Sequence, residues 1–285
     1  MRREVLLPLI VACALFVENM DSTVLSTALP AIARDLDTDP IALKLALTSY
    51  LLSLAVFIPV SGWMADRFGA RPIFISAICV YLCGSLWCAA GGSLGELVAA
   101  RFLQGMGGAM MVPVGRLVIL RSVPKAQLVQ SLAWLTIPAL VGPVLGPPLG
   151  GLIATYAHWR WIFLINLPIA LVGIVMAWRY LPNLREPQPR ALDVAGFVLS
   201  GLGLGLTIFG FSSLGGHLWP ARISVLVLLA GLALLAGYVR HARRHPDPLI
   251  DLDLFRLPTF RAGVVGGSLF RIGIGATPFL LPMRN

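Results

Sequence analysis

Long apolar runs recur along this 285-residue chain, and short polar stretches separate them. Each run has about 20 residues, the length that an α-helix needs to cross the hydrocarbon core of a bilayer. Only 12% of the residues are charged, whereas soluble domains average about 25%. Strands of a membrane barrel would instead alternate over about 10 residues. The pattern therefore predicts an all-α polytopic membrane protein.

Nine of these runs are expected to form membrane helices. They cover approximately residues 5–33, 45–64, 72–90, 94–120, 128–156, 162–181, 194–214, 223–238 and 262–285. In the sixth run, Asn166 and Pro168 mark a polar, kinked position. Lys and Arg gather in the loops on the side of the N-terminus. The positive-inside rule therefore places the N-terminus in the cytoplasm and the protein in the inner (plasma) membrane.

Several classes of partner and site are not indicated. The net charge of +9 follows the alternate loops and so reports membrane topology rather than a nucleic-acid partner. The four cysteines lie inside apolar runs and the four histidines at run ends and in loops, so no metal site is expected. An enzyme is not indicated either, because no nucleophile–base set or phosphate loop is found.

A charged stretch of ten residues lies between the second and third runs. We expect a tight aqueous loop here that holds two membrane helices at a fixed angle. Gly62 and Gly69 permit close backbone approach, while Asp66, Arg67 and Arg71 stay at the water boundary. A generic positive-inside loop is the alternative, although it explains neither the glycine spacing nor the acid.

The first run carries acidic side chains at membrane depth. Glu18, Asp21 and Ser22 share a helix face, because residues three and four apart are neighbours, and Ser26 extends that face. A carboxyl at this depth costs on the order of 2.5 to 3.5 kcal/mol, so such groups normally face a water-filled cavity or bind something. If the helix ends near Pro30, they lie instead near the outer interface.

The fourth run carries one arginine well inside its apolar sequence. Arg101 shares a face with Gln104, and we expect a buried cation that pairs with a carboxyl and shifts its proton affinity. The alternative is that Arg101 extends to the interface. Arg116 and Arg121 close the run on the side of the charged loop, so one of them is expected to pair with Asp66.

The fifth run is rich in glycine and proline. Gly142, Gly146 and Gly150 are spaced by four residues, which makes a flat face for close helix packing. Pro147 and Gly151 lie among them, and prolines remove helical hydrogen bonds and kink the axis. We therefore expect a kinked helix that packs closely on a neighbour.

Together these four stretches resemble the motifs of the major facilitator superfamily, specifically its fourteen-helix drug:proton antiporter branch (EmrB/QacA type). The chain departs from the usual motifs at Ser26, Met64 and Ala70. The matches are the loop motif at Gly62, Asp66, Arg67, Gly69 and Arg71; the fourth-helix motif at Arg101, Gln104, Gly105, Gly107 and Ala109; the antiporter motif at Gly142, Gly146, Pro147, Gly150 and Gly151; and the first-helix motif at Asp21, Thr23, Val24, Ala28, Leu29 and Pro30.

The resemblance implies proton-driven export by alternating access, in which two six-helix bundles rock around a central cavity. It makes the charged loop, together with Arg116 and Arg121, a cytoplasmic latch. It couples Arg101 to proton movement, with Asp21 or Glu18 as the carboxyl. It implies no cofactor, with the proton gradient as energy source. The implied partners are protons, the lipid bilayer, a lipophilic or cationic small molecule and, in a Gram-negative host, a periplasmic adaptor.

The resemblance also implies a domain plan with a major facilitator fold. The chain stops where a second bundle should begin, so we expect it to be a fragment of a longer product. The expected parts are a six-helix bundle (1–181), a cytoplasmic linker (182–192), an inserted helix pair (193–239), a cytoplasmic loop (240–261) and the start of a C-terminal bundle (262–285).

Two other classes of function share part of this pattern. A facilitator that imports a metabolite has the same fold and latch, but usually lacks the glycine–proline face. A non-transporting fragment, such as an assembly partner or a receptor, would tolerate neutral residues at Asp21 or Arg101. The substrate is left open, because an apolar cavity fits cationic dyes, antibiotics and lipophilic metabolites equally well.

Overall fold

The computed structural model describes residues 3–39, 42–216 and 220–280, and these residues form helices joined by short connections, with no strand among them. The helices are α1 (Arg3–Asp35), α2 (Lys44–Phe68), α3 (Ala70–Ala90), α4 (Leu94–Ser122), α5 (Leu128–Tyr156), α6 (Trp161–Leu164), α7 (Asn166–Tyr180), α8 (Val194–Gly216), α9 (Ala221–Ala242) and α10 (Pro258–Leu280), with short 3-10 turns η1 (Lys125–Gln127) and η2 (Leu252–Arg256). Eight helical segments of the described chain are long and apolar enough to cross a membrane.

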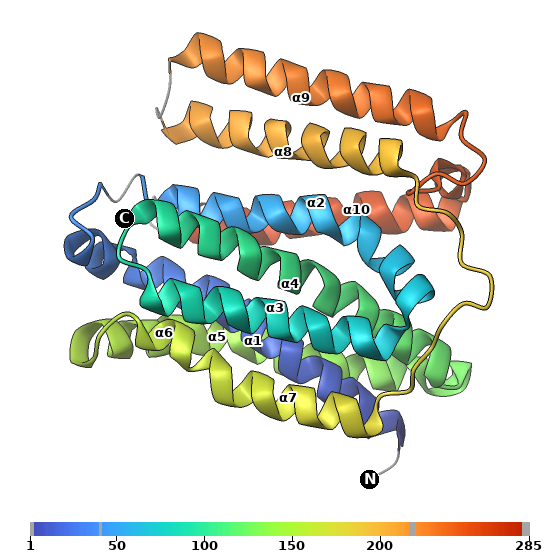
Figure 1. Cartoon of the computed structure of the whole chain (residues 1–285), viewed down its shortest axis with the longest axis horizontal. Coiled ribbons are helices and arrows are strands. Elements are labelled where there is room, and N and C mark those ends of the chain that lie inside the picture. Colours follow the sequence, from blue (N-terminus) through green and yellow to red (C-terminus); the bar gives the residue numbers. More distant parts are fainter. Residues whose placement is uncertain (1–2, 40–41, 217–219, 281–285) are drawn as a thin grey trace.

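The long helices lie side by side with their axes roughly aligned (Figure 1). α1 packs mainly on α5, α4 packs on both α2 and α3, and α7 packs on α1 and α3. α8 and α9 pair with each other, and α8 rests on α2. This arrangement confirms the predicted all-α polytopic class. The division into a bundle, an inserted pair and a second bundle stays a prediction.

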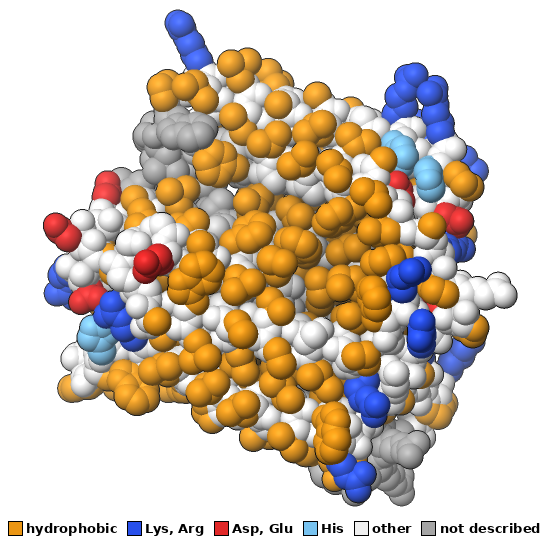
Figure 2. Space-filling view, in the orientation of Figure 1, with side chains coloured by type: hydrophobic (Ala, Val, Ile, Leu, Met, Phe, Trp, Pro, Cys, Tyr) orange, Lys and Arg blue, Asp and Glu red, His pale blue; other side chains and the backbone are white. Residues whose placement is uncertain are grey.

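The surface separates apolar and charged residues along the helix axes. Figure 2 shows hydrophobic side chains across the middle of the molecule and charged side chains gathered at its two ends. Large apolar side chains such as Val144, Trp178 and Phe211 are exposed on the helices. Soluble monomers rarely expose apolar patches larger than a few hundred Å². The band suits contact with lipid, and the chain is a multi-pass membrane protein.

The expected loop between the second and third helices is almost entirely helical, so that prediction was wrong. α2 continues to Phe68, and only Gly69 separates it from α3. Gly69 has φ +101°, which glycine tolerates well. A 25-residue helix such as α2 is about 37 Å long, whereas the apolar core of a bilayer is about 30 Å thick. The charged residues therefore continue the helix beyond the apolar layer.

The sixth apolar run is broken into α6 and α7, as the predicted kink requires. Ile165 separates the two helices, and Asn166 begins the second. Pro168 has no backbone N–H to donate to the carbonyl of Leu164, four residues earlier. The break places Asn166 at the start of α7, in the interior of the bundle.

The segment after α7 is fastened to the α2–α3 joint. It approaches through backbone groups, and Asn183 packs against Gly69. The hydrogen bonds run from Ala70 N–H to the carbonyl of Leu184 (2.8 Å), from Glu186 N–H to the carbonyl of Asp66 (3.1 Å) and from Trp63 Nε1 to the carbonyl of Arg190 (2.9 Å). The joint is therefore held from a segment more than 110 residues further along the chain.

Asp193 fixes the start of α8. Its carboxylate accepts hydrogen bonds from the backbone N–H of Gly196 (2.8 Å) and of Leu249 (3.3 Å), and it contacts Nε2 of His241 at 2.8 Å. Burial alone would raise the pKa of Asp193, but these hydrogen bonds favour the ionised form and hold its pKa below the ordinary value. One side chain thereby ties together α8, α9 and the segment after α9.

Candidate functional site

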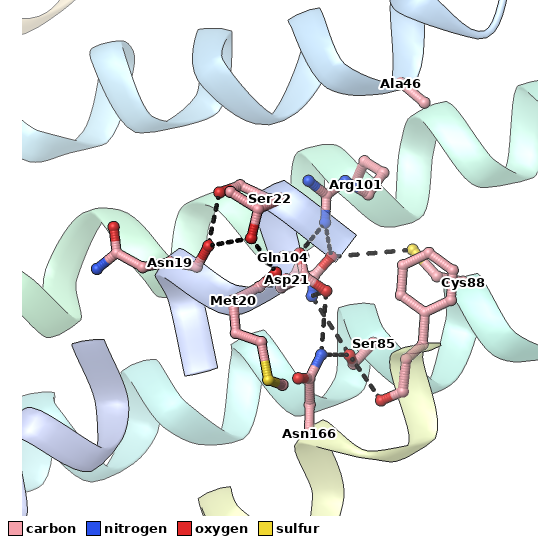
Figure 3. Close-up of polar contacts among 12 residues, drawn as sticks. Asn19, Met20, Asp21, Ser22, Ala46, Ser85, Cys88, Arg101, Gln104 and Asn166 are labelled. Atoms are coloured by element: carbon pink, nitrogen blue, oxygen red, sulfur yellow. Dashed lines mark hydrogen bonds and ion pairs between the residues drawn. The ribbon is translucent and has the colours of Figure 1, made fainter. Parts of the chain in front are cut away.

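The candidate site is a buried ion pair between two membrane helices. Asp21 of α1 and Arg101 of α4 are 1% and 0% exposed, and a guanidinium nitrogen of Arg101 donates to the Asp21 carboxylate. Figure 3 shows the two side chains pointing toward each other between α1 and α4. Burying a charge costs several kcal/mol unless a partner and hydrogen bonds compensate it. Each residue therefore depends on the other.

Neutral polar groups from three helices complete the pair. Gln104 accepts from Arg101 Nη1 at 2.6 Å and donates to Asp21 Oδ1 at 3.2 Å. Asn166 of α7 donates to the same Asp21 oxygen at 3.0 Å and to Ser85 Oγ of α3 at 3.0 Å. The Asp21 carboxylate thus accepts hydrogen bonds from α4 and α7. We call Asp21, Ser85, Arg101, Gln104 and Asn166 the buried cluster.

The guanidinium group of Arg101 also contacts an aromatic ring. Its guanidinium carbon lies 4.4 Å from the ring centroid of Tyr50 in α2, a cation–π contact. Nε and Nη2 of Arg101 have no hydrogen-bond partner among the described residues, and neither does Oδ1 of Asn166. The ring compensates part of the buried charge. The unpaired atoms are an exception to the rule that buried polar groups are hydrogen-bonded.

The sequence predicted the charged members of this cluster better than the neutral ones. Arg101 and Gln104 were expected to share a face, and the structure brings both to Asp21. Asn166 was noticed only as a polar position in a kinked run, and Ser85 and Tyr50 were missed. A single serine or tyrosine in an apolar run carries no distinguishing signal, since its partners lie on other helices.

Glu18 lies outside the buried cluster, so the expected acidic stripe divides in two. It lines a cavity of about 400 Å³ between α1, α4 and α5, together with Asn19 and Arg116. Ser22 and Ser26 donate to carbonyls of their own helix at 3.0 and 2.7 Å. Such local bonds satisfy a hydroxyl at membrane depth without a second helix. The structure thus gives Asp21 and Glu18 different surroundings.

Arg116 is not part of the charged joint, contrary to the predicted latch. It faces the cavity beside Glu18, while Arg121 donates to Asp66 at 2.8 Å. The prediction that one of the two arginines pairs with Asp66 is therefore confirmed. Five residues along an α-helix turn a side chain by about 140°. Arg116 and Arg121 therefore cannot face the same neighbour, and only Arg121 reaches the end of α2.

The other predicted latch residues have different surroundings. Arg67 lies 5.7 Å from the ring centroid of Trp63, and Arg71 is half-buried in the first turn of α3. Gly62 was expected to permit close backbone approach, but no atom lies within 4 Å of a side-chain carbon placed there. Only Gly69 fulfils that expectation, against Asn183.

We expect the variant Asp66→Asn to lose less than about 1 kcal/mol of stability. The Asp66 and Arg121 side chains are 32% and 42% exposed, so water already screens their attraction. Unfolding of the purified protein at low and high salt measures the effect, and the difference from the wild type should shrink as salt rises. A loss above about 2 kcal/mol would contradict a solvent-screened pair.

Two motif glycines bring α4 close to both of its neighbours. A side-chain carbon at Gly105 would lie 2.7 Å from the carbonyl of Tyr50 in α2. One at Gly107 would lie 2.5 Å from the carbonyl of Ala77 in α3. Both approaches are closer than side-chain carbons normally reach, so the helices pack backbone to backbone here. Arg101 lies about one turn before Gly105 on the same helix.

The glycine face of α5 packs on α1, next to the buried cluster. Gly142, Gly146 and Gly150 are buried against the stretch of α1 from 16 to 27, which includes Asp21. α5 runs as one helix in spite of its four prolines, so the expected kinks do not interrupt it. Pro147 and Gly151 face outward. The motif therefore packs against the same stretch of α1 that carries Asp21.

The sequence of the chain matches the model of a known protein family over most of its length. The model described as the Major Facilitator Superfamily matches residues 11–283. The chain belongs to this superfamily. It is 44% identical over 275 residues to proteins named "Putative multidrug resistance protein MdtD" from Citrobacter koseri and Escherichia coli. The match covers 96% of this chain but 58% of each relative, so the chain spans little more than half their length.

The fold of the chain is also similar to the folds of solved transporter structures. The POT family transporter PepTSo superposes with a TM-score of 0.58 at 15% identity, covering 88% of this chain and 56% of that protein. A D-xylose–proton symporter superposes with a TM-score of 0.55 at 16% identity, covering 79% and 65%. The predicted major facilitator fold is confirmed, and the family is one of transporters rather than enzymes.

Proposed function

We propose that this chain forms part of a transporter that exports lipophilic or cationic small molecules across the plasma membrane in exchange for protons. The observation that carries the proposal is the buried Asp21 carboxylate, which is paired with Arg101 and reached by hydrogen bonds from two helices. Membrane proteins rarely keep ionisable groups at this depth without a functional reason. The proton gradient would supply the energy, with no cofactor.

The chemistry of the cluster suits a proton-dependent change of conformation. Protonation of Asp21 would remove the negative charge that holds Arg101 and would convert an acceptor into a donor. The hydrogen bonds that Gln104 and Asn166 donate to Asp21 would then be weaker, because the acceptor would no longer be charged. A proton that binds one arrangement of helices better than another shifts the population toward it. Alternating access would use this shift.

Two further features favour export over import. The relatives that match over nearly the whole of this chain carry a multidrug resistance name. The glycine face of Gly142, Gly146 and Gly150, which the resemblance to drug:proton antiporters associates with exporters, packs on the helix that bears Asp21. Movement of α5 and protonation of the cluster would therefore act on the same helix. We place the N-terminus in the cytoplasm on the positive-inside rule.

Retention of ethidium in a drug-sensitive bacterial host tests the proposal. Cells that produce the wild-type protein should accumulate less dye than empty cells, and a protonophore should remove the difference. The variant Asp21→Asn should accumulate as much as empty cells, whereas Asp253→Asn, at an exposed acid, should behave as wild type. Dye export by Asp21→Asn at the wild-type rate would overturn the assignment, and accelerated dye uptake would favour the importer.

A further inference from the structure

Three potential metal ligands meet at the end of the bundle that carries the α2–α3 joint. Asp193 precedes α8, His241 lies in the last turn of α9, and His245 follows three residues after α9 ends. One ligand atom from each residue lies within 4.8 Å of the other two. Their separation along the chain gave no sign of this, so the sequence predicted no metal site.

One of the three ligands is already fixed in place. The Asp193 side chain is 2% exposed, and backbone N–H groups of Gly196 and Leu249 hold its two oxygens. Supporting hydrogen bonds of this kind orient the ligands of metal sites. His241 and His245 are four residues apart, with ring centroids 5.1 Å apart, so both imidazoles reach the same side. A fixed carboxylate thus faces two adjustable imidazoles.

The three ligand atoms are nearly close enough together to bind one metal ion, and small side-chain movements would complete the site. Ligands of tetrahedral Zn²⁺ lie about 3.3 Å apart, as bonds of about 2.0–2.2 Å require. His241 Nε2 and Asp193 Oδ1 are 2.8 Å apart and would open slightly, and His245 would move inward. Binding would replace that contact and the 3.2 Å bond from Asp247 N–H to His245 Nδ1. The partly exposed histidine rings leave a position for water.

Some of the charged residues around the three ligands would attract a cation, and others would repel it. Asp193 lines a cavity of about 460 Å³ in which five carboxylates face one arginine: Asp66, Glu186, Asp193, Asp247 and Asp251 against Arg190. On the histidine side, Arg240 and Arg244 line a second cavity of about 380 Å³. The acidic cavity would attract a cation, and the arginines oppose it. The ion would therefore be held by direct coordination rather than by long-range attraction.

We propose that Asp193, His241 and His245 form a binding site for a divalent transition metal such as Zn²⁺. Two imidazoles and one carboxylate are a ligand set that borderline transition metals accept, whereas Mg²⁺ and Ca²⁺ prefer oxygen ligands alone. Bound metal would link the start of α8, the end of α9 and the segment that follows it. Asp66 of the joint lines the same acidic cavity as Asp193, so the metal would lie beside the joint.

Titration with Co²⁺, which gives a visible spectrum when imidazoles coordinate it, tests the site. The protein is purified in detergent without a polyhistidine tag. We expect saturable binding of one Co²⁺ per chain, displaced by Zn²⁺ and not by Mg²⁺. His241→Ala and His245→Ala should each weaken the affinity by about tenfold or more. Asp193→Asn should do the same while still capping α8, since asparagine caps helices as well as aspartate.

His158→Ala is the matched control. His158 also lies near an acid, 3.7 Å from Asp35, but at the opposite end of the bundle. This variant should bind Co²⁺ as the wild type does, and circular dichroism checks that every variant stays folded. Absence of saturable Co²⁺ binding would overturn the proposal. Binding that survives unchanged in the folded His245→Ala and Asp193→Asn variants would overturn it equally.

Discussion

Replacement of Arg101 by leucine is expected to destabilise the protein by about 3–5 kcal/mol, because it leaves a buried carboxylate without its counter-ion. Asp21 is 1% exposed, so water cannot take the place of the guanidinium. Gln104 loses its donor at 2.6 Å in the same change. Denaturant or thermal unfolding of the purified protein in detergent measures the loss.

The double variant Asp21→Asn with Arg101→Leu separates charge from packing. It removes both buried charges, so it should be more stable than Arg101→Leu alone, in spite of the additional substitution. Asn166 and Gln104 can still donate to the amide oxygen at position 21. Equal stability of the single and double variants would contradict the view that an unpaired charge is the main cost.

The second large effect is expected at Gly146. A valine there would press directly against Thr23 Oγ1 on α1, where even a single carbon meets the threonine side chain. Forcing extra atoms into a packed interface typically costs about 1–3 kcal/mol. Gly146→Val should therefore lower stability by that amount and displace α1, which carries Asp21. Unfolding and ethidium retention should both report the change.

Gly151→Val is the matched control on the same helix. No atom lies within 4 Å of a side-chain carbon at Gly151, and this position faces outward. The control should therefore unfold and export dye as the wild type does. Thr23→Ala, which removes the hydroxyl that the introduced valine would meet, should recover part of the loss in the double variant with Gly146→Val. Equal damage from the two valine substitutions would contradict the role of the α1–α5 contact.

The helices could be predicted well because a membrane permits few alternatives. Backbone groups cannot find water in the apolar layer, so long apolar runs become helices. The same reasoning failed at the charged joint, where charge was taken to end α2. The helix reaches beyond the apolar layer to Phe68, and only Gly69, with its positive φ, ends it.

The site could be predicted only in part, because its partners come from distant helices. The cost of burying Asp21 and Arg101 made each of them conspicuous in the sequence, and their pairing follows from that cost. Ser85 and Asn166 are neutral, so burying them in a membrane helix costs little free energy and gives no signal in the sequence. Their positions in the cluster depend on how α3 and α7 pack. Arg121 pairs with Asp66, as one of the two arginines was expected to do, but Arg116, which was grouped with the same latch, faces the cavity beside Glu18.

Proton flux during substrate movement is the measurement that tests the central claim most directly. The purified protein is placed in liposomes that contain a pH-sensitive dye, the membrane voltage is clamped, and an ethidium gradient is imposed. The account predicts proton flux opposite to the ethidium flux, and no coupled flux in Asp21→Asn. Ethidium movement without proton flux, or coupling in Asp21→Asn equal to that of the wild type, would contradict the account.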